Sequence, residues 1–195
     1  MLSLSTVNLI KLYEGLRLHP YRDTTGTPTI GFGSTFYENG KQVTMDDSSI
    51  TEPRAIELLN HHLTKFATSL KSLIMKRLNE NQFGAVVSFA YNVGVGNFKN
   101  STLLKKINQN PNDATIEDEF LKYVFSKGKK LNGLVKRRQS EYDFYKKKTN
   151  LISQTMQKMI IFFKEHKKII VIVLSSVAVL IVGIVTFKAF KNGKK

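Results

Sequence analysis

Two carboxylic acids and a hydroxyl group near the N-terminus have the types and spacing needed to hydrolyse a glycosidic bond. They are Glu14, Asp23 and Thr29, in the pattern E-x8-D-x5-T. Such hydrolysis needs one carboxyl group kept protonated, to give a proton to the leaving oxygen, and a second kept ionised, to act on water or on the developing positive charge. Taken singly, each residue is more often structural: an exposed glutamate, a turn aspartate, a strand threonine. Their joint spacing favours a catalytic set.

The sequence around the two carboxyl groups suggests different roles for them. Glu14 lies between Tyr13 and Leu16 at the end of a predicted helix, where it can be partly removed from water. Asp23 lies in the polar segment YRDTTG. Because burial favours the neutral form of a carboxyl group, we expect Glu14 to be the acid and Asp23 its ionised partner.

The elements that must position these residues predict an α+β fold, with a small β-hairpin lobe beside a mainly helical lobe and a cleft between them. The first helix should end at Gly15 and bury one face. The apolar residues of that face are Leu9, Leu12, Tyr13 and Leu16. Within 27–44 the period changes, and Asn39-Gly40 is typical of a tight β-hairpin turn.

The rest of the first 150 residues predicts helices. Thr51 and Pro53 stand where an N-cap and a first-turn proline would begin a second helix. Its apolar face would be formed by Leu58, Leu59, Leu63, Phe66 and Leu70. Asn79 to Gln82 resembles a capping box before FGAVVSFAY, which is apolar nearly all round and predicts the central buried helix. Shorter helices are expected near 102–108, 116–126 and 134–147.

Four segments, in this order and spacing, resemble the phage-type lysozymes, the muramidases found as endolysins in bacteriophages and prophages. They are YEGLRLHPYRDTTGTPTIGFGST, ITEPRAIELL, AYNVGVGNFKNSTLL and GLVKRRQSEYDFY, which together cover about residues 5–146. The resemblance implies a lysozyme-like fold and hydrolysis of the β-1,4 bond between N-acetylmuramic acid and N-acetylglucosamine in peptidoglycan, without metal or cofactor. It implies Glu14 as the general acid, Asp23 as the carboxylate that orients or activates water, and Thr29 as the hydroxyl that helps to place it.

Four further residues are candidates for the site. Arg137 and Arg138 lie in the segment that resembles the family's closing helix, and one of them is expected to pair with Glu14. At least one of the two should instead face solvent, because neighbouring residues of a helix point about 100° apart. Asn92 is a candidate for hydrogen-bonding a sugar, with Tyr91 offering an apolar face. The resemblance implies inversion at the anomeric carbon, which needs the two carboxyl groups roughly 6.5–9.5 Å apart.

Positive charge is spread unevenly along the chain. The formal net charge is +15, and residues 151–195 carry eight basic side chains and one acidic one. Residues 122–148 carry ten basic and two acidic side chains, for which an anionic cell wall and a merely soluble face are the two interpretations. Nucleic acid is not expected as a partner. The chain has no cysteine, which excludes disulfides and thiolate metal sites.

A membrane span is predicted near the C-terminus. Ile169–Phe187 is 19 residues without a charge, which as a helix would cross about the 30 Å hydrocarbon core of a bilayer. Lysines flank both ends, so the positive-inside bias gives no orientation. We therefore expect a catalytic domain at 1–149, a helical stalk at 150–168 with an apolar patch at Met159–Phe163, the span at 169–187 and a basic tail at 188–195.

The leading hypothesis is a single-pass membrane-anchored muramidase with a monomeric catalytic domain that degrades the cell wall of a bacterial host. The N-terminus does not resemble a cleavable signal peptide, so the side of the membrane is left open. Two rival hypotheses are a membrane-permeabilising protein that uses the basic tail, and a non-hydrolytic wall-binding module. The first rival would still kill cells after Glu14→Gln, and the second would cut no glycan.

Overall fold

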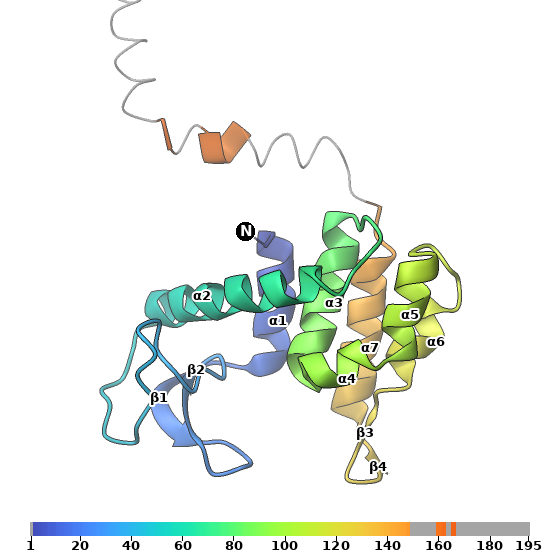
Figure 1. The fold of residues 1–195 in the computed structure, drawn as a ribbon. Coiled ribbons are helices and arrows are strands. Elements are labelled where there is room, and N and C mark those ends of the chain that lie inside the picture. The colour runs from blue at the N-terminus through green and yellow to red at the C-terminus, as the bar shows by residue number, and fades with distance from the viewer. Residues whose placement is uncertain (1, 149–158, 163–164, 167–195) are drawn as a thin grey trace, which may run out of the picture. The chain divides into compact units, whose positions relative to one another are not determined.

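The computed structural model describes residues 2–148, 159–162 and 165–166. The chain divides into two compact units, 1–148 and 149–195, and the first contains every candidate site residue. Figure 1 shows that first unit as a group of helices with a β lobe at one side. Its elements, in chain order, are α1 (Leu4–Glu14), β1 (Arg17–Arg22), β2 (Pro28–Gly31), α2 (Glu52–Lys71), α3 (Glu80–Val93), α4 (Val95–Lys99), α5 (Thr102–Gln109), α6 (Ile116–Leu121), β3 (Phe125–Ser126), β4 (Lys129–Lys130) and α7 (Asn132–Tyr145).

Helix α3 is the central element of the helical lobe, as predicted. It begins at the predicted capping box, in which Asn79 and Gln82 each bond the other's backbone N–H, and it packs against both α1 and α7. Gly84 makes this packing close: a Cβ atom there would lie 2.1 Å from Thr6 Oγ1 and 2.8 Å from Phe144 Cε1. The three helices therefore meet where α3 has no side chain.

Helix α1 ends at the predicted residue but buries a different face. Gly15 closes it with φ 70, a left-handed conformation that favours glycine. The buried residues are Thr6, Val7 and Ile10, whereas Leu12 is 71% exposed. The predicted face was wrong because α3 packs on the face that carries Thr6, whose hydroxyl is satisfied by the Ser3 side chain.

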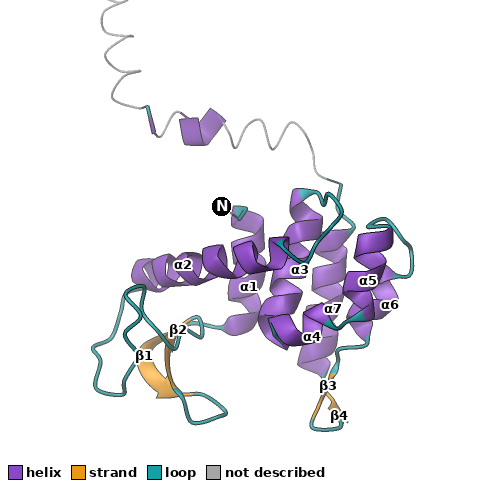
Figure 2. Cartoon of the chain, viewed as in Figure 1, coloured by secondary structure: helices purple, strands orange, loops and turns teal. Residues whose placement is uncertain are grey.

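The β lobe is built from two strands that precede the predicted turn. Strand β1 pairs antiparallel with β2, placing Tyr21 opposite Thr29, and Figure 2 shows the lobe as mostly loop around this pair. A turn does form at Asn39-Gly40, where Gly40 N–H donates to the Tyr37 carbonyl. It is flanked by a single bridge and no regular strand. The α+β class is confirmed, but the main hairpin lies earlier in the chain than predicted.

A second hairpin stands where the end of a helix was expected. The predicted helix at 116–126 ends at Leu121 as α6, and Phe125–Ser126 forms β3, which pairs with β4. Lys127 and Gly128 connect the two strands with φ 48 and φ 76. Two successive positive φ values suit the right-handed twist of a two-residue hairpin, and they are incompatible with a continuing helix.

In the second unit, the described residues are a helical turn at 159–162 and residues 165–166. All four apolar side chains of the turn, Met159, Ile160, Ile161 and Phe162, are about half exposed. The predicted span at 169–187, the basic tail at 188–195 and most of the stalk lie outside the described residues. None of the helices within the described ranges has the length and apolar character needed to span a bilayer.

Candidate active site

Glu14 is the last residue of α1, and its side chain is held by the closing helix. Arg137 Nη2, from α7, donates to Glu14 Oε1 at 2.8 Å, and the Glu14 side chain is 21% exposed. The neighbouring Tyr13 fixes the same two helices, because its hydroxyl donates to Ser140 Oγ at 2.6 Å and its ring lies under the Arg137 guanidinium. The carboxyl group is thus placed at the surface by buried partners.

Arg137 and Arg138 belong to a buried ion network whose anionic centre is Glu141. Glu141 Oε1 accepts from Arg137 Nε and from Arg138 Nη2, each at 3.1 Å, and from the Ser88 hydroxyl at 2.8 Å. Arg138 Nε lies 2.8 Å from Glu141 Oε2, in a charge contact without hydrogen-bond geometry. Burial raises the pKa of Glu141, while the two guanidinium groups and the Ser88 hydroxyl lower it. Two positive charges thus face two carboxyl groups, Glu14 and Glu141.

Arg137 is therefore the arginine that pairs with Glu14, and the expected exposure of one arginine was wrong. Arg137 is 4% exposed and Arg138 is fully buried. Neighbouring helix positions do point in different directions, but Glu141 lies within reach of both side chains, at i+4 from Arg137 and i+3 from Arg138. The positive charge that Arg137 brings to Glu14 is shared with this second carboxyl group.

Asp23 is positioned by a local turn between β1 and β2. Its Oδ1 accepts three hydrogen bonds, from the Thr25 N–H and hydroxyl and from the Thr27 N–H, at 2.7 to 2.9 Å. These donors, the Thr25 hydroxyl first among them, lower the pKa of Asp23. The turn therefore favours the ionised form of this carboxyl group, and the residue stays partly exposed to solvent.

Tyr21 connects the two carboxyl groups through the β lobe. Burial raises the pKa of Tyr21, Arg17 lowers it, and the negative charges of Asp23 and Glu14 both raise it further. Tyr21 is also the strand partner of Thr29, which is buried and donates from Oγ1 to the Thr27 carbonyl at 2.9 Å. Asp23 and Thr29 thus share the β lobe, and Glu14 ends the helix that leads into its first strand.

Tyr91 lines a cavity beside Glu14. The cavity has a volume of about 340 Å³. It is lined by Gly33, Ser34, Thr35, Phe36, His62, Lys65, Phe66 and Tyr91. Gly33 connects it to Glu14, because a Cβ there would lie 4.0 Å from Glu14 Oε2. Burial, followed by the Glu14 charge, raises the pKa of Tyr91 to about 12, which keeps its hydroxyl a hydrogen-bond donor.

Asn92 lies at the exposed end of α3, and its oxygen is already engaged. Arg138 Nη2 donates to Asn92 Oδ1 at 3.0 Å, which leaves the amide NH2 group for a sugar. A second cavity, of about 380 Å³, lies in the β lobe and includes Arg22 and Thr27, on either side of the Asp23 turn.

Tyr21, Ser88 and Glu141 are site residues that the sequence analysis missed. Glu141 had a usable signal, because its spacing from Arg137 and Arg138 is that of helical ion pairs. Tyr21 and Ser88 had none, since a strand tyrosine and a helix serine are common at structural positions.

The sequence and the fold of this chain are similar to those of known proteins. The phage lysozyme family model matches residues 11–141, a range that contains every candidate site residue. An endolysin of Bacillus phage B103 is 41% identical over 142 residues, 72% of this chain and 52% of that protein. A SAR-endolysin of Bacteriophage PS119 is 38% identical over 130 residues, 67% of this chain and 74% of that protein. The solved endolysin from Escherichia coli O157:H7 phage FAHEc1 has 35% identity and a TM-score of 0.67, covering 75% of this chain and 93% of that chain.

The match spans about half the length of the B103 protein and three quarters of the PS119 protein. It includes the helix end that carries Glu14, the turn that carries Asp23 and the closing helix that carries Arg137. On the extent of the family match and the shared fold, this chain belongs to the phage lysozyme family.

Proposed function

We propose that the protein is a lysozyme that hydrolyses the β-1,4 bond between N-acetylmuramic acid and N-acetylglucosamine, and so degrades bacterial peptidoglycan and lyses a host cell. Family membership supports this proposal, as does the contrast between the two carboxyl groups at the site. Both residues are partly exposed, but Glu14 pairs with a buried guanidinium group of α7, whereas Asp23 accepts three hydrogen bonds from its own turn. Glycosidase chemistry needs such a pair in unlike environments.

In the proposed reaction, the Glu14 carboxyl group gives its proton to the glycosidic oxygen as the bond from that oxygen to the anomeric carbon breaks. Asp23 orients a water molecule and takes its proton as the water oxygen bonds to the anomeric carbon. Thr29 helps to place that water. Tyr91 and the amide of Asn92 bind the glycan beside Glu14. The anomeric configuration inverts, and no metal or cofactor takes part.

The nature of the new reducing ends tests this proposal. Purified peptidoglycan is digested with the full chain, the products are reduced with borohydride, and the sugar alcohols are identified. Reduced N-acetylmuramic acid is the expected product. Reduced N-acetylglucosamine alone would assign the other glycosidic bond, and an absence of new reducing ends would reject hydrolysis in favour of wall binding.

We further propose that residues 169–187 tether the enzyme to a bilayer as a single membrane span. The support is the uncharged 19-residue sequence with lysines on both sides. The full chain should float with phosphatidylcholine vesicles after a carbonate wash at high pH. A variant with Val173→Lys and Leu180→Lys should not float, because two charges at these depths oppose insertion. Equal flotation of both proteins would contradict the span.

A further inference from the structure

The loop that joins α2 to α3 presents an apolar side chain together with basic ones. Met75 is 79% exposed, and Lys76 and Arg77 follow it directly, both exposed. Neither Lys76 nor Arg77 forms an ion pair with any described residue. A large exposed apolar side chain beside unpaired cations has the composition of a membrane-surface contact.

The backbone of this loop is fixed by one side chain of α5. Asn108 Oδ1 accepts from the Met75 N–H at 2.8 Å, and Asn108 Nδ2 donates to the Leu73 carbonyl at 3.0 Å. These two bonds bracket Ile74 and hold the loop tip in one conformation. The fixed backbone therefore holds Met75 in its exposed position. Binding of a partner would not have to order the loop, so little conformational entropy would be lost there.

A cavity of about 290 Å³ borders the loop and is lined by apolar and charged side chains. Ile74, Leu78 and Phe83 supply apolar surface, and the polar lining consists of Lys71, Lys76, Asn79 and Glu80, two cations against one carboxylate. The Lys71 ammonium lies over the Phe83 ring, 5.8 Å from its centroid. An excess of positive charge beside apolar surface suits a lipid leaflet, in which anionic headgroups lie next to acyl chains.

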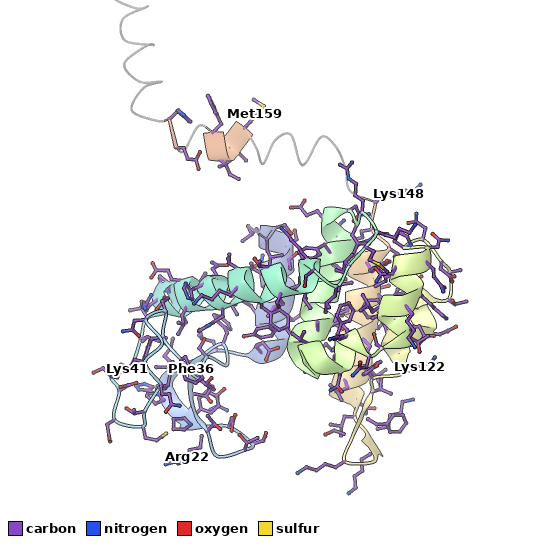
Figure 3. All side chains as sticks on the ribbon, viewed as in Figure 1. Arg22, Phe36, Lys41, Lys122, Lys148 and Met159 are labelled. Carbon is purple, nitrogen blue, oxygen red and sulfur yellow. The ribbon has the colours of Figure 1, made fainter. Side chains whose placement is uncertain are left out.

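The same end of the first unit is where the chain leaves it. Asn81 Nδ2, in the first turn of α3, donates to the Lys147 carbonyl at 3.0 Å, and the described part of the unit ends at Lys148. The contacts of Gly84 with Thr6 and Phe144 confirm that α1 and α3 begin at this end and that α7 finishes there. Figure 3 shows Lys148 at one end of the unit and Arg22 of β1 at the other.

Glu14 lies at the far end of α1 from this surface. Helix α1 has 11 residues, so about 15 Å of helix separates its start from Glu14. A contact made by the α2–α3 loop would therefore hold the exit end against a surface and turn the Glu14 end away from it.

We propose that the loop 72–78, with Met75 at its tip and Lys71, Lys76 and Arg77 around it, is a docking surface for anionic lipid headgroups. It gives the catalytic unit a second membrane contact and points the active site toward the cell wall. This inference rests on the proposed tether: twenty residues, 149–168, separate the unit from the proposed span, so the tether limits distance while the loop fixes orientation.

Single cysteines test this proposal cleanly, because the chain contains none. Met75→Cys, in the full chain, is labelled with bimane and mixed with phosphatidylcholine vesicles that contain or lack phosphatidylglycerol, and brominated lipids are used as quenchers. Ser126→Cys is the matched control, because it lies in the β3–β4 hairpin, which also combines an exposed aromatic residue, Phe125, with lysines but precedes the other end of α7.

Strong quenching at position 75, weak quenching at position 126 and dependence on phosphatidylglycerol are the expected results. Reversing the loop charges with Lys76→Glu and Arg77→Glu should weaken loop binding roughly tenfold or more, while flotation and glycan cleavage in detergent stay unchanged. Equal quenching at both positions would contradict the docking surface. So would an unquenched label on Met75→Cys when the protein floats with the vesicles, and that result would still support the tether. Quenching at position 75 without flotation on phosphatidylcholine would support the loop and reject the tether.

A polyanion of the cell wall is the competing partner. If soluble teichoic acid shifts the emission of the label at position 75 and anionic vesicles do not, the surface binds wall polymer and the lipid assignment is wrong.

Discussion

Glu14 and Asp23 lie on the two lobes of the molecule, and the lobes hold them by different means. The helical lobe positions Glu14 through the buried Arg137. Arg137 is in turn held by Glu141, one turn further along α7, and by the Ser88 carbonyl of α3. The β lobe positions Asp23 through Thr25 and Thr27, which lie within four residues of it. One carboxyl group is set by tertiary packing and the other by a local turn.

This difference should let mutations separate the stability of the unit from the ionisation of a carboxyl group. Damage on the helical side should reduce the stability of the whole unit, because buried charges would lose their partners. Damage on the β side should change the ionisation of Asp23 and leave the core intact.

The variant Glu14→Gln should lose glycan cleavage about 10²–10⁴-fold, the usual contribution of a general acid. The amide is close in shape and can still accept from Arg137, so the fold should persist. The measurement is the initial rate of reducing-end release from purified peptidoglycan. Glu57→Gln, at an exposed position of α2, is the control and should cut at the wild-type rate. A Glu14→Gln enzyme with more than a tenth of the wild-type rate would contradict the role of Glu14 as general acid.

The variant Glu141→Gln should reduce the free energy of unfolding by about 3–5 kcal/mol, because it leaves Arg138 buried without its anion. Asp143→Asn is the matched control two residues along α7, where the carboxylate is half exposed and paired with Lys146. Its loss should stay within about 1 kcal/mol. Urea unfolding of the two variants measures the contrast. Equal stabilities would show that the ion network contributes nothing beyond a surface pair.

The variant Gly84→Ala should destabilise the helical lobe by about 1–3 kcal/mol or more, because its Cβ would overlap Thr6 Oγ1. Alanine normally improves a helix by about 1 kcal/mol over glycine, so the steric effect has to exceed that gain. Gly96→Ala in α4 is the control, since a Cβ there meets nothing within 4 Å. Thermal melts should show a lower midpoint for the first variant and an unchanged or higher one for the second.

The variant Thr25→Val should shift the acid side of the pH–rate profile to higher pH. Asp23 must be ionised to act on water, and the Thr25 hydroxyl is the largest contributor to its lowered pKa. Activity in the wild type is therefore lost only as pH falls through this low pKa. Removing the hydroxyl raises the pKa toward its ordinary value, so the loss begins at higher pH. Thr25→Ser keeps the hydroxyl and should keep the wild-type profile. An unshifted Thr25→Val profile would mean that Asp23 does not set the acid limb.

The local parts of the site were the parts that sequence could predict. Glu14 at a helix end, Asp23 in a turn and Thr29 in a strand were predicted correctly, because each of these elements is determined by nearby residues. The same is true of the helix starts at Thr51 and Asn79, where a capping side chain bonds a backbone N–H three residues on.

The parts that failed depend on contacts between distant elements. Leu12 fits a helix periodicity, yet it is exposed because α3 packs on the other side of α1. The spacing of Glu141 from Arg137 and Arg138 could have predicted the two ion pairs, but not that tertiary packing buries all three side chains. The turn at Lys127-Gly128 was not predicted, because lysine rarely adopts the positive φ that this turn requires.

The most direct test of the account uses a substrate that does not need an acid. Fluoride leaves an anomeric carbon without a proton, so a glycosyl fluoride of the peptidoglycan glycan bypasses the role of Glu14 but still needs water activated by Asp23. We predict that Glu14→Gln releases fluoride at close to the wild-type rate while failing on glycan, and that Asp23→Asn is impaired on both substrates. Equal loss of both activities in Glu14→Gln would contradict the assignment of Glu14 as the proton donor.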